Sequence, residues 1–369
     1  MKKISLTGNE AVAYALKQVE PEVISFYPIT PTTEIIQLTN KYILEGKMKT
    51  EMILAESEHS ALSACVGAAA CNLRTVTATA SQGLLYMHEV LTVASGLNLP
   101  IVMIVGNRSI SAPLNIHNDH SDTMAVKDSG WLQFYAENPQ EAYYLTILAF
   151  KITNLIKIPA MICLDGFITT HELTKINILS DKEVKNFLGK KDKQKSLFNF
   201  EKAPIFGQLS LPDSYLYFRF KLAKKIKKSK KIIEKTFTNF NQKFQTHFNL
   251  IETFNLTTAK NIIIASSSIC GTIKETITQN LKEWGLIKIT TYRPFPKKSL
   301  INICKNKEKI IILDKSLTFK GEKTGHLYEE VKEALFDLQE KPKIFGEVVG
   351  LGGKAFSPKD LKKLIQKYE

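Results

Sequence analysis

The sequence lacks the closely spaced cysteine pairs that hold iron–sulfur clusters and structural zinc ions. Its 369 residues include five cysteines, and no two of them form a Cys-x-x-Cys pair. Because such sites need several thiolate or imidazole ligands at short spacings, we expect no cluster and no zinc site in this chain. If electrons leave the protein, another chain carries them. We expect the cysteines to be reduced core residues, namely Cys65, Cys71, Cys163, Cys270 and Cys304.

The sequence also lacks long hydrophobic runs. No apolar stretch reaches the roughly 18 to 20 residues that a membrane-spanning helix needs. Lys2 and Lys3 are not followed by an apolar segment with a small-residue cleavage site, so we expect no signal peptide and a cytoplasmic location. With 44% hydrophobic and 23% charged residues, the composition is that of a globular protein long enough for two domains.

Acidic residues are outnumbered, with 36 Asp and Glu against 50 Lys and Arg, for a net charge of +14. The lysines gather in residues 185–195 and 221–235 without forming the aromatic-interleaved platforms of nucleic-acid-binding surfaces. We therefore expect no nucleic acid and no membrane partner, and interpret these runs as solvated helix faces or a surface for an acidic protein. The alternative is a non-catalytic basic binding module, whose binding would fall steeply with salt.

Short apolar runs alternate with helical patterns through the first half of the chain. Residues 23–27, 52–55, 75–78, 101–105 and 160–164 are predicted strands, each apolar enough for a sheet that is buried on both faces. The predicted helices are residues 10–19, 31–44, 60–71, 83–97 and 139–155, the first capped by Asn9 and the last by Asn138. This alternation predicts an α/β fold with a mostly parallel sheet.

The second half divides into two parts. Residues 181–258 are rich in lysine, with one long helix expected over residues 215–240, and are interpreted as a linker or insertion. Alternation resumes with predicted strands at residues 261–265, 287–291 and 310–313, and with helices at residues 272–284 and near Leu327 and Leu361. The expected domains are therefore residues 1–180, the linker 181–258, and a smaller α/β domain at 259–369.

Three polar residues follow predicted strands of the first domain. The segment Tyr27-Pro28-Ile29-Thr30-Pro31 is typical of a helix start, with Thr30 as the cap and Pro31 in the first turn. The free N–H groups of such a start suit a carboxylate or phosphate. Glu58 and Arg108 follow two further strands, so all three side chains are expected at one edge of the sheet.

Glu58 and Arg108 each admit two interpretations. Glu58 either interacts favourably with the dipole of its helix or acts as a general acid/base in a cleft. Arg108 either pairs with a surface acid or grips a carboxylate through two parallel hydrogen bonds.

The loop of residues 114–122 carries two histidines and two aspartates. His117, Asp119, His120 and Asp122 resemble metal ligands in type, but a single loop rarely brings enough of them together without strain. We expect no metal site here and a loop that shapes the pocket or meets a partner. The segment Thr79-Ala80-Ser81-Gln82-Gly83 either touches a cofactor or simply turns the chain.

The ordered set of motifs resembles the 2-oxoacid:ferredoxin oxidoreductase family, most closely alpha subunits of pyruvate:ferredoxin oxidoreductases. The resemblance covers nearly the whole chain and is weakest in the lysine-rich middle. Its motifs are Tyr27-Pro28-Ile29-Thr30-Pro31, Glu56-Ser57-Glu58, Thr79-Ala80-Ser81-Gln82-Gly83-Leu84, Asn118-Asp119-His120-Ser121-Asp122, Asp165-Gly166-Phe167, Thr291-Tyr292-Arg293-Pro294-Phe295, Gly350-Leu351-Gly352-Gly353-Lys354 and Phe356-Ser357-Pro358.

The resemblance implies a thiamine-diphosphate enzyme with a pyrimidine-type domain followed by a transketolase C-terminal-like domain that serves mainly in assembly. In such enzymes the alpha subunit holds the aminopyrimidine ring, while a beta subunit holds the diphosphate and its magnesium. Iron–sulfur clusters belong to beta and delta-type subunits, beside a gamma subunit. By matching position, Glu58 would bind the pyrimidine ring nitrogen, and Thr30 and Arg108 would bind the substrate carboxylate.

The activity implied by the resemblance is the reversible oxidative decarboxylation of pyruvate with coenzyme A to acetyl-CoA and carbon dioxide, with reduction of ferredoxin. The same reaction on 2-oxoisovalerate, 2-oxoglutarate or an arylpyruvate stays open, because pocket volume decides specificity and single residues do not reveal it.

Overall fold

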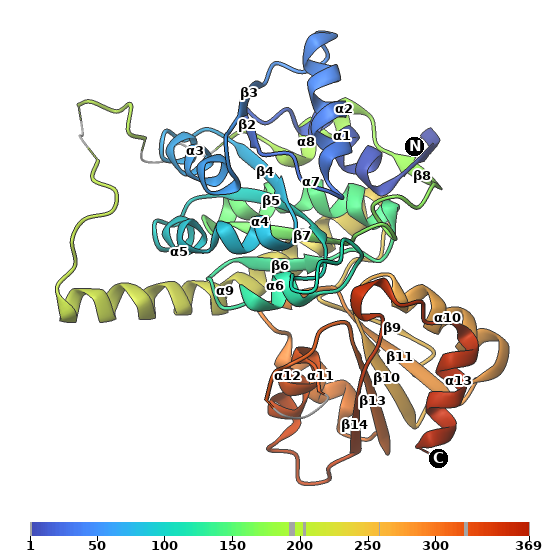
Figure 1. The fold of residues 1–369 in the computed structure, drawn as a ribbon. Helices are drawn as coiled ribbons and strands as arrows, with labels where there is room; N and C mark the ends of the chain where they lie inside the picture. The colour runs from blue at the N-terminus through green and yellow to red at the C-terminus, as the bar shows by residue number, and fades with distance from the viewer. Residues whose placement is uncertain (1, 192–195, 202–203, 258, 321–323, 369) are drawn as a thin grey trace.

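The computed structural model describes residues 2–191, 196–201, 204–257, 259–320 and 324–368. Within these ranges the strands form three sheets, of seven, five and two strands. The two larger sheets are the centres of two α/β bodies, which we call the first and the second body (Figure 1). The prediction of a mixed α/β fold with mostly parallel sheets and a second α/β domain is confirmed.

The sheet of the first body has the strand order β12-β6-β7-β5-β4-β2-β3. Neighbouring strands are parallel except β12 and β6, which are antiparallel. The polar residues that follow β2, β3, β4 and β5 therefore lie at one edge. The strands are β2 (Val23–Phe26), β3 (Glu51–Leu54), β4 (Thr75–Thr79), β5 (Ile101–Asn107), β6 (Leu132–Tyr135), β7 (Ala160–Asp165) and β12 (Thr291–Arg293).

Helices cover both faces of this sheet (Figure 1). Alternate residues of each strand point to opposite faces, so Val102 and Ile104 of β5 pack in one core while Met103 and Val105 pack in another. The first core is closed by α1 (Gly8–Val19), α2 (Thr33–Leu44), α7 (Pro139–Ile156), α8 (Asp181–Leu188) and part of α9 (Pro212–Phe244). The second is closed by α3 (Glu58–Ala70), α4 (Ser81–Tyr86), α5 (His88–Gly96) and α6 (Ser121–Ala125).

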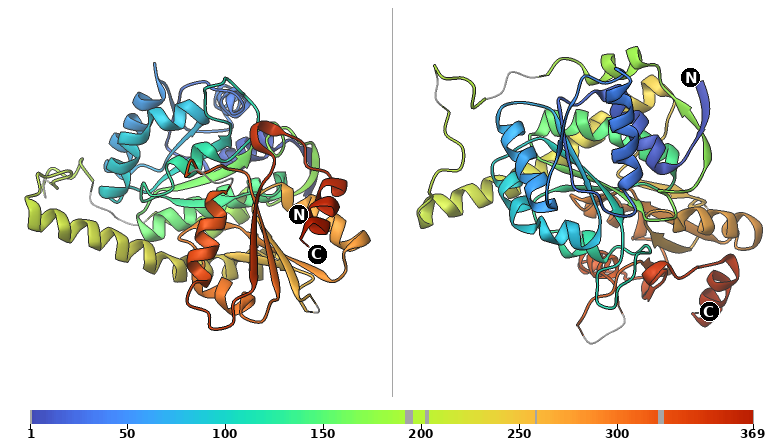
Figure 2. Two further views of the ribbon diagram at one scale, coloured as in Figure 1. Left: turned by 60° about the horizontal axis from the view of Figure 1, so that its bottom comes forward. Right: turned by 45° about the horizontal axis from the view of Figure 1, so that its top comes forward.

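Two smaller features complete the first body. The strands β1 (Lys2–Leu6) and β8 (Thr174–Ile178) pair antiparallel as a separate ribbon. The 33-residue helix α9 packs against α7 with its carboxyl-terminal part, while its start projects from the body in every view (Figures 1 and 2).

The sheet of the second body has the order β14-β13-β10-β11-β9, with β9 the antiparallel strand at one edge. Helices α11 and α12 cover one face, and α10 and α13 cover the other (Figure 1). The elements are β9 (Ile251–Phe254), β10 (Asn261–Ala265), β11 (Trp284–Ile289), β13 (Lys309–Asp314), β14 (Lys343–Val348), α10 (Ile269–Asn280), α11 (Lys297–Cys304), α12 (His326–Leu335), α13 (Pro358–Lys367) and the short 3₁₀ helix η1 (Leu351–Gly353).

A buried lysine joins the two bodies. The Nζ atom of Lys288, in β11, lies 2.9 Å from carboxylate oxygens of both Glu137 and Glu252 and also pairs with Glu141. Burial alone would lower the pKa of Lys288, but the three carboxylates raise it above its usual value. Lys274 provides a second cation, at 2.6 Å from Glu137. The charges of this cluster are therefore compensated across the interface.

Several predicted element boundaries need correction. Helix α1 begins at Gly8 because Thr7, and not Asn9, is its cap, and the Asn9 side chain donates to Pro31 O instead. The predicted helix 83–97 is two helices separated at Met87. The predicted helix 272–284 ends at Asn280, and Trp284 starts β11. The Asn138 cap is confirmed, since its side chain accepts from Glu141 N.

Two remaining expectations concern the cysteines and membranes. All five cysteines are free thiols, four of them buried and Cys71 half-buried. Among the helices of the described ranges, none has both the length and the apolar character needed to cross a bilayer.

Candidate active site

The three candidate residues lie at the carboxyl edge of the first sheet. Thr30 follows β2, Glu58 begins α3 directly after β3, and Arg108 follows β5. In the sheet these strands are neighbours, with β4 between β5 and β2. The edge therefore brings an exposed threonine, a carboxylate and a guanidinium into one region, and the last two are largely buried, with 8% and 9% of their surface exposed.

Thr30 does not cap a helix. The N–H and the hydroxyl of Thr32 both donate to Ile29 O at 2.9 Å, which closes a turn over residues 29–32. Helix α2 consequently begins at Thr33, so the prediction of a helix start at Pro31 is wrong. The turn nevertheless places the Thr30 carbonyl toward the next loop, where it accepts a hydrogen bond from Arg108 Nη1 at 3.1 Å.

Arg108 has one buried donor without a partner. Its Nη1 donates to Thr30 O, but its Nε is buried and makes no hydrogen bond to any described residue. An unpaired buried N–H group costs about 1–3 kcal/mol. The free Nε belongs to the planar fork through which arginine binds carboxylates, so the site has a cationic donor ready for an anion.

Asp122 fixes the backbone around Arg108. Its buried carboxylate accepts hydrogen bonds from the backbone N–H groups of Ser81 and Arg108, each at 3.0 Å, and from Asn107 Nδ2 at 2.8 Å. Burial raises the pKa of Asp122 to about 6 despite these donors. The carboxylate thus ties the loop after β4 to the loop after β5.

Glu58 lies over a glycine of the neighbouring helix. Ser57 caps α3 by accepting from Ser60 N, which leaves the Glu58 side chain free of a capping role. A Cβ atom at Gly83 would stand 2.6 Å from both Glu58 Oε1 and Thr79 Oγ1, so a side chain at this position would displace Glu58 from its present place. Within the described residues no hydrogen-bond donor reaches the Glu58 carboxylate, and it is available to a ligand.

The edge is connected through the segment after β4. In the described part of the chain no hydrogen bond joins Glu58 to Thr30 or Arg108 directly. Instead, Gly83 contacts Glu58, while Ser81 Oγ donates to Ser109 O at 2.5 Å, next to Arg108. The Nε2 atom of Gln82, between them, is buried without a partner. This segment therefore forms the wall between the carboxylate and the guanidinium.

The histidines and aspartates of the loop 114–122 point to different partners. His120 pairs with Asp165, its Nε2 lying 2.8 Å from Asp165 Oδ1, whereas Asp119 accepts from Ser109 Oγ at 2.7 Å. The His117 ring packs against Phe167, with their centroids 5.3 Å apart. Over the ranges that the structure describes, no group of three or more His, Cys, Asp or Glu side chains is placed to hold a metal ion.

The second body supports the loop that follows Arg108. Asn115 Nδ2 donates to Gly352 O at 3.0 Å, and Gly353 N donates to Asn118 O at 2.7 Å. Both glycines have positive φ, +60° and +79°. A Cβ atom at Gly353 would lie 2.5 Å from His117 Cβ. This contact was missed from the sequence, although the clustered glycines of residues 350–353 are a turn signal.

Asp165 makes a second link between the bodies. Its Oδ2 atom lies 2.6 Å from Lys315 Nζ and accepts hydrogen bonds from Ser268, and its Oδ1 pairs with His120. Burial alone would raise the pKa of this carboxyl, but Lys315 and His120 hold it well below its usual range. The carboxylate is therefore ionised and fixes the second body to the loop that contains His120.

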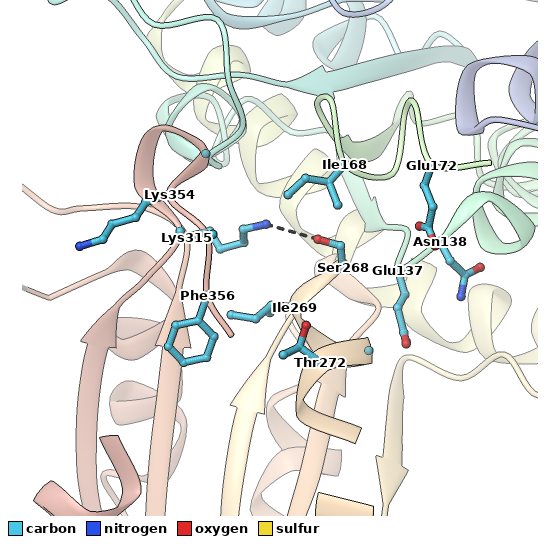
Figure 3. A pocket seen from close by; sticks show the side chains of 14 residues that line it. Glu137, Asn138, Ile168, Glu172, Ser268, Ile269, Thr272, Lys315, Lys354 and Phe356 are labelled. Carbon is cyan, nitrogen blue, oxygen red and sulfur yellow. Dashed lines mark hydrogen bonds between the residues drawn. The ribbon is translucent and has the colours of Figure 1, made fainter. Parts of the chain in front are cut away.

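A cavity of about 410 Å³ opens between the bodies beside this link (Figure 3). Its wall contains the start of α10 with Ser268, the side chains of Lys315 and Lys354, and on the opposite side Glu137 and Glu172. None of Thr30, Glu58 and Arg108 lines it. The candidate site is thus the open edge of the first sheet and not this cavity.

Exposed apolar side chains surround the open edge. Leu54, at the end of β3, is 68% exposed, and Leu114, in the loop after Arg108, is 75% exposed. Tyr86, at the end of α4, is 60% exposed. Apolar groups gathered around a polar site are typical of surfaces covered by another protein.

Comparisons with known proteins give two family matches. Residues 14–238 match the family described as "Pyruvate flavodoxin/ferredoxin oxidoreductase, thiamine diP-bdg", and residues 259–361 match "Pyruvate:ferredoxin oxidoreductase core domain II". The two matches leave out only the ends of the chain and the stretch between them.

Individual relatives cover nearly the whole chain. The pyruvate synthase subunit PorA of Methanothermobacter thermautotrophicus is 39% identical over 99% of this chain and 94% of its own length. The corresponding subunit of Pyrococcus furiosus is 40% identical over 95% and 89%. The ketoisovalerate oxidoreductase subunit VorA of Pyrococcus horikoshii is 37% identical over 99% and 93%.

One solved structure shares the fold. It is the 2-oxoglutarate:ferredoxin oxidoreductase from Magnetococcus marinus with 2-oxoglutarate, coenzyme A and succinyl-CoA bound. The TM-score is 0.76 at 16% identity, and the alignment covers 99% of this chain and 65% of that one. The present chain therefore spans slightly less than two thirds of the solved chain, and the likeness concerns the fold alone.

Proposed function

This chain belongs to the pyruvate flavodoxin/ferredoxin oxidoreductase family, and we propose that it is the subunit of a pyruvate synthase that binds the aminopyrimidine half of thiamine diphosphate. The reaction is the reversible oxidative decarboxylation of pyruvate with coenzyme A to acetyl-CoA and carbon dioxide, with electrons passed to ferredoxin. Full-length relatives named pyruvate synthase subunits, at 38–40% identity, support pyruvate as the substrate.

A second candidate substrate is the branched 2-oxoisovalerate. A relative named as a ketoisovalerate oxidoreductase subunit is 37% identical over 99% of the chain, which equals the identity of two of the pyruvate synthase subunits. Identity alone separates the two substrates weakly, so the assay must include both. The structural neighbour that binds 2-oxoglutarate supports the fold and not that substrate.

The residues at the open edge fit the pyrimidine half of the cofactor. The Glu58 carboxylate is largely buried and accepts no hydrogen bond from the described chain, as a carboxylate reserved for a ring nitrogen should be. Gly83 leaves the space beside it that any Cβ atom would fill. When bound, thiamine diphosphate supplies a carbon nucleophile and an electron sink for the decarboxylation of a 2-oxoacid.

Glu58 is proposed as the proton-handling residue. A carboxylate hydrogen-bonded to the pyrimidine ring nitrogen holds a proton at that atom and shifts the ring toward the tautomer whose exocyclic nitrogen acts as a base. The close approach to Gly83 restricts the positions that the carboxylate can take. The role therefore depends on the position of Glu58 at the first turn of α3.

Arg108 and Thr30 are proposed to bind the substrate carboxylate. Because Nη1 of Arg108 is held by Thr30 O, the free Nε and its neighbouring Nη2 can form two parallel hydrogen bonds to a carboxylate. The exposed hydroxyl of Thr30 adds a donor on the same turn. Asp122 holds the Arg108 backbone in place and is a positioning residue.

Partner subunits complete the site in this proposal. The edge is open and surrounded by exposed apolar side chains, which supports cover by a beta subunit that holds the diphosphate and magnesium. Because the sequence has no Cys-x-x-Cys pair, the proposal assigns the iron–sulfur clusters to beta and delta-type subunits, with a gamma subunit completing the complex. Coenzyme A and ferredoxin would then be bound by the assembly.

The observation that carries the proposal is the buried Glu58 carboxylate over Gly83, at the same edge as the partnerless Arg108 Nε. The test is co-expression with the partner subunits and an assay of ferredoxin reduction with pyruvate, 2-oxoisovalerate and 2-oxoglutarate. We expect pyruvate to give the highest kcat/KM. A preference for 2-oxoisovalerate would establish the second candidate, and no reduction with any 2-oxoacid would reject the proposal.

A further inference from the structure

The first third of α9 is exposed to solvent along its whole length. Every residue from 211 to 221 is exposed, and burial begins only at Leu222. At about 1.5 Å per residue, this part of the helix extends roughly 15 Å from the body. It projects in all three views of the molecule (Figures 1 and 2).

The projecting helix is apolar on most of its surface. Five large side chains in its first nine residues are 40–68% exposed, namely Tyr215, Leu216, Tyr217, Phe218 and Phe220. Leu209 and Leu211, just before the helix, are 92% and 71% exposed. A helix that is apolar all round is normally buried, and aromatic residues are enriched where proteins meet. We call residues 204–221 the arm.

The chain reaches the arm from the end of α3, the helix that begins at the candidate site. Leu197, in the segment before the arm, donates its N–H to Ala70 O at the end of α3 at 3.1 Å, whereas Gly207 of the arm lies near Leu97 at the end of α5. Helix α3 begins at Glu58. Helix α3 therefore spans about 20 Å between the candidate site and the segment that precedes the arm.

The part of α9 that follows the apolar residues of the arm is strongly basic. Residues 212–231 contain eight bases and one acid, Asp213. Lys225 is held within the chain by Asn98 Oδ1 at 2.7 Å, but Lys221, Lys224, Lys227 and Lys228 are exposed and form no ion pair within the described ranges. These lysines can therefore pair with carboxylates of another molecule.

From these observations we infer that the arm clasps a different subunit of the assembled oxidoreductase, at an apolar groove bordered by carboxylates. The inference rests on the proposed function for the existence of that subunit. A second copy of this chain is disfavoured, because two arms side by side would bring two basic helices together, and like charges at an interface cost several kcal/mol. Since the segment before the arm lies at the end of α3, the helix that carries Glu58, we assign the groove to the subunit that covers the candidate site.

The test compares two matched double variants of the chain, each co-expressed with the partner subunits. The arm variant, Leu216→Glu with Phe220→Glu, places two carboxylates on one face of the arm. The control variant, Leu173→Glu with Phe336→Glu, makes the same exchange outside the arm, at side chains that are 66% and 70% exposed. Because Leu216 and Phe220 are 57% and 68% exposed, the isolated arm variant should keep its circular dichroism spectrum and melting temperature. Assembly is measured by native mass spectrometry and by titration of the purified chain into the remaining subunits.

We expect the arm variant to assemble at least ten-fold more weakly than the wild type, with the control within two-fold. Lys227→Glu with Lys228→Glu should also weaken assembly, by less at 0.5 M than at 0.05 M salt, because salt screens the attraction. Full assembly of the arm variant would overturn the inference and leave the proposed function intact, whereas a wild-type chain that joins no partner would overturn both.

Two further outcomes would also overturn the inference. A wild-type chain that dimerises alone, with the arm variant monomeric, would assign the arm to a second copy. Sedimentation of the wild type, but not of the arm variant, with vesicles of anionic phospholipid would assign it to a membrane surface.

Discussion

The carbonyl oxygen of Thr30 accepts a hydrogen bond from Nη1 of Arg108 at 3.1 Å, across the ends of two strands that are separated by β4. The bond uses one of the donors of the guanidinium and orients the others. It also fixes the turn of residues 29–32 against the loop that begins at Arg108. Substrate binding is therefore expected to depend on both segments at once.

Replacement of Arg108 by lysine should raise the KM for the 2-oxoacid about 10- to 100-fold, because lysine cannot form two parallel hydrogen bonds to a carboxylate. The affinity of the assembled enzyme for thiamine diphosphate should change little. Arg74→Lys, before β4 at the opposite edge of the sheet, is the control and should leave KM unchanged. Equal KM values for Arg108→Lys and wild type would exclude Arg108 from substrate binding.

Replacement of Glu58 by glutamine should lower kcat at least 100-fold, because an amide neither takes up nor releases a proton at the pyrimidine ring. Assembly of the complex should be normal. Glu56→Gln is the matched control, since Glu56 is an exposed carboxylate two residues away that accepts a hydrogen bond from Ser60 Oγ. Steady-state ferredoxin reduction checks both variants, and near-normal activity of Glu58→Gln would reject its assigned role.

Replacement of Gly353 by alanine should disturb the loop after Arg108 from the other body. The new Cβ atom would stand 2.5 Å from His117 Cβ, so the loop must move. Gly46→Ala is the control, because Gly46 also has positive φ, +69°, but has open space around it. Both variants should lose about 1–2 kcal/mol of stability from backbone strain. Only Gly353→Ala should also raise the KM for the 2-oxoacid, about ten-fold, and an unchanged KM would show that the second body does not position the site.

The pH dependence of stability should report on Asp122. Burial raises the pKa of Asp122 from its ordinary value of 3.8 to about 6 in the folded chain, so folding takes up a proton between these pH values. The contribution of Asp122 is fully present below pH 3.8 and is lost as the pH rises through about 6, an effect of about 3 kcal/mol. The Asp122→Asn variant has no ionisable carboxyl group at this position and is the control.

The comparison is made by thermal melts of wild type and Asp122→Asn from pH 4 to pH 8. The wild type should lose stability relative to the variant as the pH rises across this range. A constant difference between the two melting temperatures would show that Asp122 has the same pKa in the folded and unfolded states.

Replacement of Lys288 by methionine should destabilise the chain by about 3–5 kcal/mol, because it leaves buried carboxylates without their cation. Chemical denaturation measures the loss. Lys260→Met provides the comparison, since Lys260 pairs with Glu308 at the surface, at 75% and 64% exposure, and such pairs contribute about 0–1 kcal/mol. Similar losses in the two variants would show that the buried cluster does not stabilise the chain.

Most of the strands that the sequence predicts correctly are apolar runs that are buried on both faces, but β3 is predicted although it is largely exposed, and β6 is missed although it is buried. Val102 to Val105 is apolar at every position, and β5 contains it. The strands β1 and β8 were missed because they alternate polar and apolar residues over only five positions. The helix break at Met87 was missed because residues 83–97 have no proline or glycine near the break.

The sequence also predicts only part of the candidate site. The rule that residues after parallel strands converge directs attention to Thr30, Glu58 and Arg108, which lie at one edge. The contact of Arg108 with the Thr30 carbonyl, and not with its hydroxyl, depends on a turn that the sequence does not reveal. The support of Asn115 and His117 by Gly352 and Gly353 joins residues more than 230 positions apart, beyond any local pattern.

The strand β12 belongs to the first sheet, although it follows β11 of the second body in the chain. Its partner β6 is therefore an edge strand in any fragment that stops before residue 291. Such a fragment would expose the unpaired backbone of β6, together with Tyr135, which packs against Tyr292 in the complete chain. A gene truncated between the two bodies should consequently yield an aggregating product and not a smaller working protein.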